Sequence, residues 1–137
     1  MSRSVNFEGL KCSALVTFKS ALVKGTDENK LVKASANGTI VLCSEDENFT
    51  GIVRIIDNFD KAASVQIDGF VEDYPCDPDF EPVVSDGGGW QLLQCGSDAT
   101  MVKLATAPEG QQLAPGTIPL RKVVEVDTSA HTLTFQL

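Results

Sequence analysis

Hydrophobic residues recur along this chain at every second position or in short β-branched runs, and clusters of turn-forming residues separate the runs. Because successive side chains of a β-strand point to opposite faces, a period of two predicts strands. The longer period of an amphipathic helix is almost absent, and the spacing of the turns is typical of all-β domains. We expect some eight or nine short strands, within residues 12–18, 31–35, 39–44, 49–57, 62–74, 90–96, 100–105, 117–127 and 131–137.

The clearest hairpin is predicted around Asn37-Gly38, between the runs at 31–35 and 39–44. Asn and Gly tolerate the positive φ angles of a tight hairpin turn, so we expect both residues to adopt them.

Residues 62–74 are expected to form one continuous strand, in which Gly69 marks a bulge or a close approach of another backbone. The alternation divides its side chains between two faces. Val65, Ile67 and Val71 lie on one face, and Gln66, Asp68, Phe70 and Glu72 lie on the other.

So many short strands must pack face to face or close on themselves, which predicts an all-β fold, a single small β-barrel or sandwich. The chain has 137 residues, a length that suits one domain, placed here at residues 11–137. Residues 1–10 precede the first turn signal and are interpreted as an extended N-terminal arm that reaches a neighbouring subunit. A frayed terminus is the alternative.

Composition places the chain among soluble globular proteins. Hydrophobic residues make up 42% and charged residues 22% of it, values that argue against wholesale disorder. No run of about 18 apolar residues occurs, and the first residues lack the apolar stretch of a signal peptide. We therefore expect synthesis in a cytoplasm and no membrane insertion.

The formal net charge of −8 argues against nucleic acid as a partner, because binding to a phosphate backbone depends on Lys and Arg. The charge is also uneven along the chain. Residues 1–35 hold six basic and three acidic residues, a net +3, whereas residues 45–98 hold two basic and thirteen acidic residues, a net −11. Such separation can orient docking on a partner of complementary charge, and an uneven solvated surface is the alternative.

The four cysteines are widely spaced and do not form the close pairs of a zinc site, and the single histidine, His131, has no partner near it in sequence. We expect no metal site. Reduced thiols are expected, with Cys43 and Cys95 buried as small apolar side chains, while a disulfide stays open as an alternative.

The candidate catalytic and cofactor-binding motifs of the sequence are incomplete. Asp77, Asp79 and Glu81 are spaced like calcium ligands, but the glycine and glutamate that complete an EF-hand are missing. The glycines before Trp90 lack the lysine and the helix of a phosphate loop. His131 is expected on an alternating strand as a surface or interface residue, without a nucleophile beside it. The sequence therefore predicts neither a cofactor nor an enzyme.

Taken in order, four segments resemble the small decoration (cement) proteins of tailed-bacteriophage capsids. They are "LVKASANGTIVLCSEDENFTGIVRIID", "KAASVQIDGFVEDYP", "WQLLQCGSDATMVKLATAPEG" and "GTIPLRKVVEVD". Gly38, Gly51, Gly69 and Gly96 stand where the glycines of that family's strands and turns fall. One departure is the stretch "SDGGG" in place of the family's Gly-Asp before the strand that follows the loop.

The resemblance implies a β-barrel or β-tulip-like domain that forms a homotrimer on the outer surface of the virion. In such proteins the trimer sits at three-fold or quasi-three-fold axes and bridges subunits of the major capsid protein. The chain would be made in the host cytoplasm and act without a cofactor, nucleic acid or membrane.

We expect contacts to the capsid or to sister subunits from the arm and from aromatic residues around the acidic corner, since arginine and aromatic side chains are favoured at interface centres. Each of these aromatic residues is alternatively a core residue. A surface module that binds host glycan through Trp90, Tyr74 and the carboxylates of the acidic loop is the competing function. The expected contact residues are Arg3, Val5, Phe7, Leu10, Phe59, Phe70, Tyr74 and Phe80.

Overall fold

The computed structural model describes residues 15–81, 91–105 and 120–137, and this part of the chain consists of strands, turns and loops without a helix. The predicted all-β fold with a barrel is confirmed. No helix that could cross a membrane occurs in the described ranges. The strands are β1 (Leu15–Ser20), β2 (Leu31–Ala36), β3 (Thr39–Leu42), β4 (Gly51–Asp57), β5 (Ala62–Gln66), β6 (Phe70–Pro75), β7 (Gln91–Cys95), β8 (Val102–Leu104), β9 (Leu120–Asp127) and β10 (Thr132–Gln136).

Strands β1 to β5 form a closed barrel in the order β1-β3-β2-β4-β5. All of its neighbouring strands are antiparallel except β1 and β3, which run parallel and pair Ser20 with Ile40. This barrel, residues 15–66, is called the first unit below.

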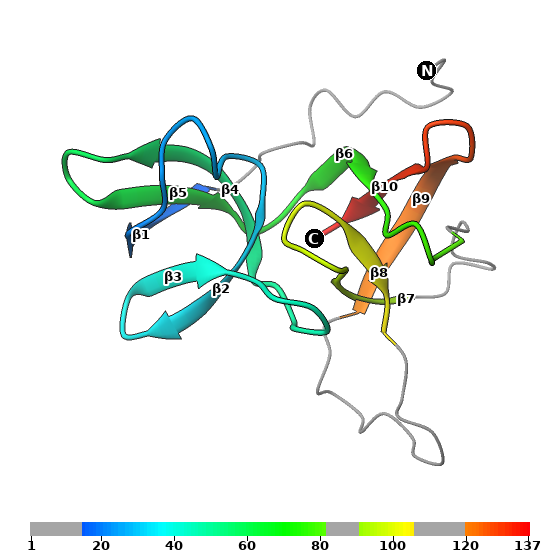
Figure 1. The fold of residues 1–137 in the computed structure, drawn as a ribbon, viewed down its shortest axis with the longest axis horizontal. Helices are drawn as coiled ribbons and strands as arrows, with labels where there is room; N and C mark the ends of the chain where they lie inside the picture. The colour runs from blue at the N-terminus through cyan, green and yellow to red at the C-terminus, as the bar shows by residue number, and fades with distance from the viewer. Residues whose placement is uncertain (1–14, 82–90, 106–119) are drawn as a thin grey trace, which may run out of the picture.

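Strands β6 to β10 form a five-stranded sheet in the order β6-β10-β9-β7-β8, which lies beside the barrel (Figure 1). Its two ends meet where Cys76, directly after β6, forms a parallel bridge with Val102 of β8, and where Asp77 N–H donates to the Val102 carbonyl at 2.8 Å. Described residues between 70 and 137 are called the second unit.

The two units have the same arrangement of strands. Through the bridge at Cys76, the second unit follows the ring order β6-β8-β7-β9-β10, which matches β1-β3-β2-β4-β5 strand for strand, including the parallel first pair. The pairing register of β4 with β5 is the same as that of β9 with β10. Each residue pair within 52–66 has its counterpart 70 residues later within 122–136, and the register shifts directly after residue 53 in one pair and residue 123 in the other. The chain therefore contains two structurally equivalent five-strand units in tandem.

The cores of the units are equivalent too. Residues that occupy matching register positions are buried in both, apart from partly buried Val126, which indicates that each unit closes around the same pattern of inward-facing side chains. Inside the barrel they are Val32, Ile40, Val53, Ile56, Ala63 and Val65, and their counterparts are Leu93, Val102, Val123, Val126, Leu133 and Phe135.

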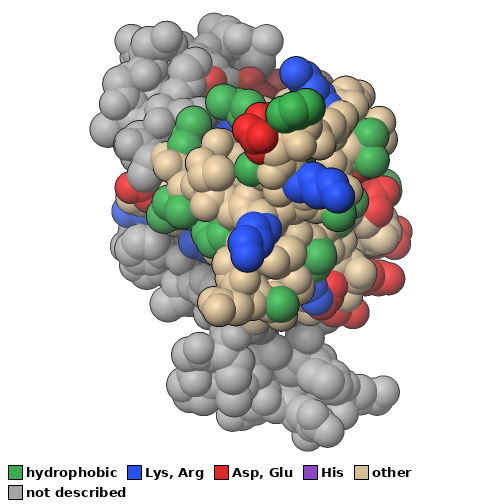
Figure 2. All heavy atoms as spheres, turned by 90° about the vertical axis from the view of Figure 1, so that its left-hand side faces the viewer, with side chains coloured by type: hydrophobic (Ala, Val, Ile, Leu, Met, Phe, Trp, Pro, Cys, Tyr) green, Lys and Arg blue, Asp and Glu red, His purple; other side chains and the backbone are tan. Residues whose placement is uncertain are grey.

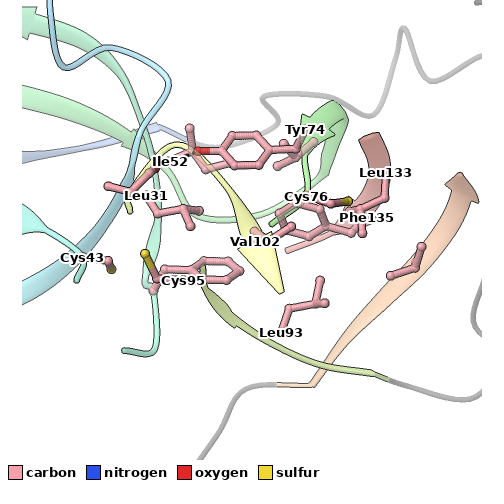
Figure 3. Packing of buried hydrophobic residues seen from close by; sticks show 14 of the residues in the cluster. Leu31, Cys43, Ile52, Tyr74, Cys76, Leu93, Cys95, Val102, Leu133 and Phe135 are labelled. Atoms are coloured by element: carbon pink, nitrogen blue, oxygen red, sulfur yellow. Dashed lines mark hydrogen bonds between the residues drawn. The ribbon is translucent and has the colours of Figure 1, made fainter. Parts of the chain in front are cut away.

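A larger hydrophobic cluster joins the two units. Figure 3 shows Leu31 and Ile52 of the first unit in this cluster together with Tyr74, Leu133 and Phe135 of the second. Because side chains of both units share one buried cluster, the described residues pack as a single body. Cys43, Cys76 and Cys95 are buried free thiols, and the predicted burial of Cys43 and Cys95 is confirmed.

The hairpin at Asn37-Gly38 is confirmed, with β2 and β3 antiparallel on either side of it. The expectation that both turn residues have positive φ is wrong, because only Gly38 does, at 72°. The strands are adapted to this turn by a register shift between Ala34 and Ala36.

The prediction of one strand over residues 62–74 is wrong, since β5 ends at Gln66 and β6 begins at Phe70 in the other unit. Gly69, with φ at 80°, redirects the chain between them. The buried Gln66 side chain donates to the carbonyls of Asp68 at 2.9 Å and Phe70 at 3.1 Å, and its oxygen accepts from Arg54. A buried polar side chain thus holds the crossing in place.

Candidate interaction surfaces

The expected contact residues of the arm, Arg3, Val5, Phe7 and Leu10, lie outside the described residues, and so does Trp90. The four expected aromatic residues are described and fall into two groups. Phe59 is exposed and Phe70 is half-buried, whereas Tyr74 and Phe80 are buried in the shared hydrophobic cluster.

Tyr74 is 5% exposed and its hydroxyl donates to the main chain inside the protein. The acceptors are the carbonyls of Asn29 at 2.8 Å and Ala99 at 3.2 Å, one in each unit. Burial raises the pKa of the phenol above its usual value. Tyr74 therefore follows the core alternative, and its hydrogen bonds tie the two units together.

Phe59 lies in the turn between β4 and β5 with 93% of its surface exposed. The turn is held by Asp57, whose Oδ1 accepts from the backbone N–H groups of Phe59 and Asp60. It has a structural twin between β9 and β10, in which Asp127 Oδ1 accepts from Ser129 and Ala130.

The twin turn provides an internal comparison. Lys61 and His131 close the two turns with φ of 51° and 56°, and their carbonyls accept from Ser20 N–H and Cys76 N–H, both at 3.0 Å. The position of Phe59 is thus occupied by serine in the second unit, so the turn itself does not require an aromatic residue. The expectation that His131 sits within a strand is wrong, because His131 ends this turn.

Exposed hydrophobic side chains gather on the first unit. All seven large hydrophobic residues that are exposed among the described residues belong to segment 15–67, and none to the described residues of the second unit. Figure 2 views the molecule from the barrel side and shows hydrophobic side chains interspersed with Lys and Arg side chains over this face. The residues are Leu15, Val16, Val23, Val41, Ile55, Phe59 and Ile67.

Ile55, 58% exposed, is a candidate contact residue that the sequence reasoning missed. It lies opposite Ser64 of β5, which in turn lies opposite Thr17 of β1, so these three positions form one row across the barrel wall. The signal was available in the adjacent pair Ile55-Ile56, since neighbouring strand residues face opposite sides and one of the two must face outward. The counterpart of Ile55 in the second unit is Glu125.

An acidic surface lies where the two units meet, with Lys30 and Glu45 from the first unit and its other charged residues from the second. Two adjoining hollows of about 490 and 380 Å³ share Glu45 and Ser97, and together they form what we call the acidic groove. Its walls hold five carboxylates against two lysines, a net charge of −3. The charged residues are Glu45, Asp77, Asp79, Glu81, Asp98, Lys30 and Lys103.

Asp77 organises the corner after β6. Its carboxylate oxygens accept from the backbone N–H groups of Asp79 at 3.0 Å and Ser97 at 2.7 Å. The Asp79 bond is the largest influence that holds the pKa of this carboxyl below its usual value, and it outweighs burial, which acts in the opposite direction. The group is therefore charged at neutral pH.

Both lysines of the groove form ion pairs. Lys103 Nζ lies 2.5 Å from Asp46 and 3.6 Å from Glu45, and Lys30 Nζ lies 3.1 Å from Asp27. No group of three or more His, Cys, Asp or Glu side chains that could hold a metal ion occurs in residues 15–81, 91–105 and 120–137. The groove is suited to a cationic surface of a partner.

Comparison with protein-family models, with curated protein sequences and with solved structures gives no match. The chain's function is therefore argued from its own surfaces.

Proposed function

We propose that the protein is a capsid decoration protein, which binds the outer surface of a tailed-bacteriophage head as a homotrimer and bridges major capsid protein subunits. The resemblance in turn and strand pattern supports this function. The observation that carries it is the gathering of exposed hydrophobic side chains on the first unit, with Phe59 at 93% exposure. Apolar patches and exposed aromatic residues are typical of protein interaction sites.

Internal comparison strengthens this assignment of the docking surface. Where the first unit exposes Ile55 and Phe59, equivalent positions of the second unit hold Glu125 and Ser129. The strand pairs that carry these positions, β4–β5 and β9–β10, have the same register, so folding does not dictate the hydrophobic residues at these positions. A binding role explains why exposed hydrophobic side chains occur in one unit and polar ones in the other.

Bridging of subunits explains how such a protein stabilises a shell without any chemistry. A shell under pressure from packed DNA fails where its subunits separate, and a protein that spans the seam binds only the closed arrangement. In a trimer, docking of one copy holds the other two at high local concentration, so weak individual contacts add up.

The structure gives less support to glycan binding. One of its two expected aromatic contacts, Tyr74, is buried and hydrogen-bonded inside the protein.

The proposal is tested by co-sedimentation of the protein with undecorated phage heads. The test variant is Ile55→Thr/Phe59→Ser. Each of the two side chains contributes about 1.5–3 kcal/mol to binding if it is fully buried against the head. The affinity of the variant for heads should therefore fall roughly tenfold or more per residue. The free energy of unfolding should stay within about 0.5 kcal/mol, because both side chains are exposed.

The matched control is Thr128→Ala in the twin turn of the second unit, where residue 128 is also exposed. It should leave binding to heads unchanged. Equal binding by wild-type protein and the Ile55→Thr/Phe59→Ser variant would show that this surface does not dock, and no binding by either would refute the function.

A further inference from the structure

The two equivalent units differ in charge around the end of their first strand. Residues 19–25, which span the end of β1 and the loop after it, and residues 75–81, which span the end of β6 and the loop after it, occupy the same place. In each, Ser20 or Cys76 makes the same hydrogen bond and the same kind of parallel pairing. We call these segments the basic loop and the acidic loop. Their sequences are "KSALVKG" and "PCDPDFE", with net charges of +2 and −3.

The basic loop presents its charge outward beside an apolar residue. Lys19 and Lys24 are exposed, and Val23 between them is 54% exposed. Lys24 N–H donates to Asn58 Oδ1 at 3.1 Å, which places the loop beside the turn that carries exposed Lys61. Asp27 accepts from Val23 N–H and from Lys30, and Glu28 accepts from Gly25 N–H. The turn that carries Lys61 also holds Asp57, whose Oδ1 accepts from two backbone N–H groups, and exposed Asp60.

The acidic loop forms one wall of the acidic groove. Asp79 and Glu81 are exposed there, and Asp77 is charged beneath them. Phe80 and Leu104 supply apolar surface next to these carboxylates. The groove therefore offers negative charge and apolar contact together, which is the complement of two exposed lysines around a valine.

We propose that the basic loop of one copy docks in the acidic groove of a second copy. The proposal rests on the self-association in the proposed function and names the contact that produces it. Because the two loops are on different units, the contact is head-to-tail, and such contacts close into rings when the rotation between copies allows it. Three copies would then present six equivalent five-strand units around one axis.

The test is the mass of the full chain in solution, measured by sedimentation without phage heads. The wild type should assemble, and Lys19→Glu/Lys24→Glu or Asp79→Lys/Glu81→Lys should each weaken assembly roughly a hundredfold, because like charges then face each other. All four side chains are exposed, and unchanged melting temperatures will confirm that the variants fold. Lys122→Glu, a charge reversal on β9, should have no effect.

The decisive variant combines all four substitutions. It restores the wild-type net charge and an attraction between the loops with opposite polarity, −2 on residues 19–25 against +1 on residues 75–81, so it should assemble more tightly than either two-substitution variant. In the wild type itself, assembly should weaken as NaCl rises from about 50 mM to about 1 M, because salt screens exposed charges.

A wild type that is monomeric at every concentration, or a combined variant that stays monomeric, would overturn the proposal. Assembly of either two-substitution variant with wild-type affinity would overturn it as well. A monomer that still binds phage heads would refute this contact and leave shell docking standing. An assembled ring that ignores heads would refute shell docking and leave this contact standing.

Discussion

Gly51 begins β4 at a point where the backbone of β5 leaves no room for a side chain. A Cβ atom added to it would lie 2.1 Å from the Gln66 carbonyl oxygen and 2.8 Å from Val65 Cγ1. The first obstacle is backbone, which cannot move without displacing the paired strand. Glycine is therefore required here by close packing rather than by a turn.

Gly51→Ala should lower the free energy of unfolding by roughly 3 kcal/mol, since overpacking of this kind forces backbone shifts. Gly25→Ala is the control, because a Cβ there meets no atom within 4 Å and adds only the strain of its φ of 88°. That strain costs about 1 kcal/mol. Urea unfolding of both variants measures the difference, and equal losses would show that β4 and β5 can separate more easily than we infer.

The alternation of hydrophobic and polar residues did not suffice to predict which aromatic side chains are buried. A period of two assigns Tyr74 to a face of its strand, but it does not say which face another sheet will cover. Phe59 was predictable as a contact residue, because a large apolar side chain in a polar turn has no neighbours in sequence to bury it. Tyr74 required knowledge of Asn29 and Ala99, which lie far away in the chain.

At the scale of elements, the hairpins could be predicted from the sequence. The point at which the chain leaves the barrel after β5 and enters the second sheet at β6 could not. The pairs β2–β3, β7–β8 and β9–β10 follow from local turn residues. The crossing from β5 to β6 depends instead on Gln66, whose hydrogen bonds to Asp68, Phe70 and Arg54 form only when both units are folded. Alternation continues through Gly69 and conceals the break.

The internal repeat was missed for a related reason. Residues 52–66 and 122–136 share only three identical positions out of fifteen, Val53/Val123, Asp57/Asp127 and Gln66/Gln136. The units share their pairing register and the hydrophobic nature of their inward-facing residues. Many unrelated β sequences also satisfy these two conditions. The aspartate that caps each turn, at an offset of 70, was the available signal.

Asp77, which holds the corner after β6, makes the free energy of unfolding depend on pH in the acidic range. Its pKa is lowered in the folded protein, so the stability it contributes is present above the unfolded value, 3.8, and is lost as pH falls through the folded value. Asp77→Asn should cost roughly 1–2 kcal/mol at pH 7, where charged hydrogen bonds are lost. It should also flatten the fall in stability below about pH 4.

Thermal unfolding between neutral pH and about pH 2 measures this dependence. Asp79→Asn is the control, because its side chain is exposed on the same corner. If Asp77→Asn retained the full acid dependence of the wild type, other carboxylates would have to carry it.

At the scale of the whole molecule, two equivalent units have diverged in their surfaces while keeping one architecture. The first exposes hydrophobic residues beside lysines, and the carboxylates that line the groove come mostly from the second. The acidic stretch of the sequence, residues 45–98, belongs to both units. Such a molecule can bind a shell with one surface and its own copies with others.

The most direct test of this account is an electron-microscopy map of undecorated phage heads incubated with the protein. The account predicts three copies around each occupied three-fold or quasi-three-fold axis, with the first unit, including Ile55 and Phe59, against the shell. Bare heads, or copies that contact the shell through the second unit while Phe59 faces solvent, would contradict it.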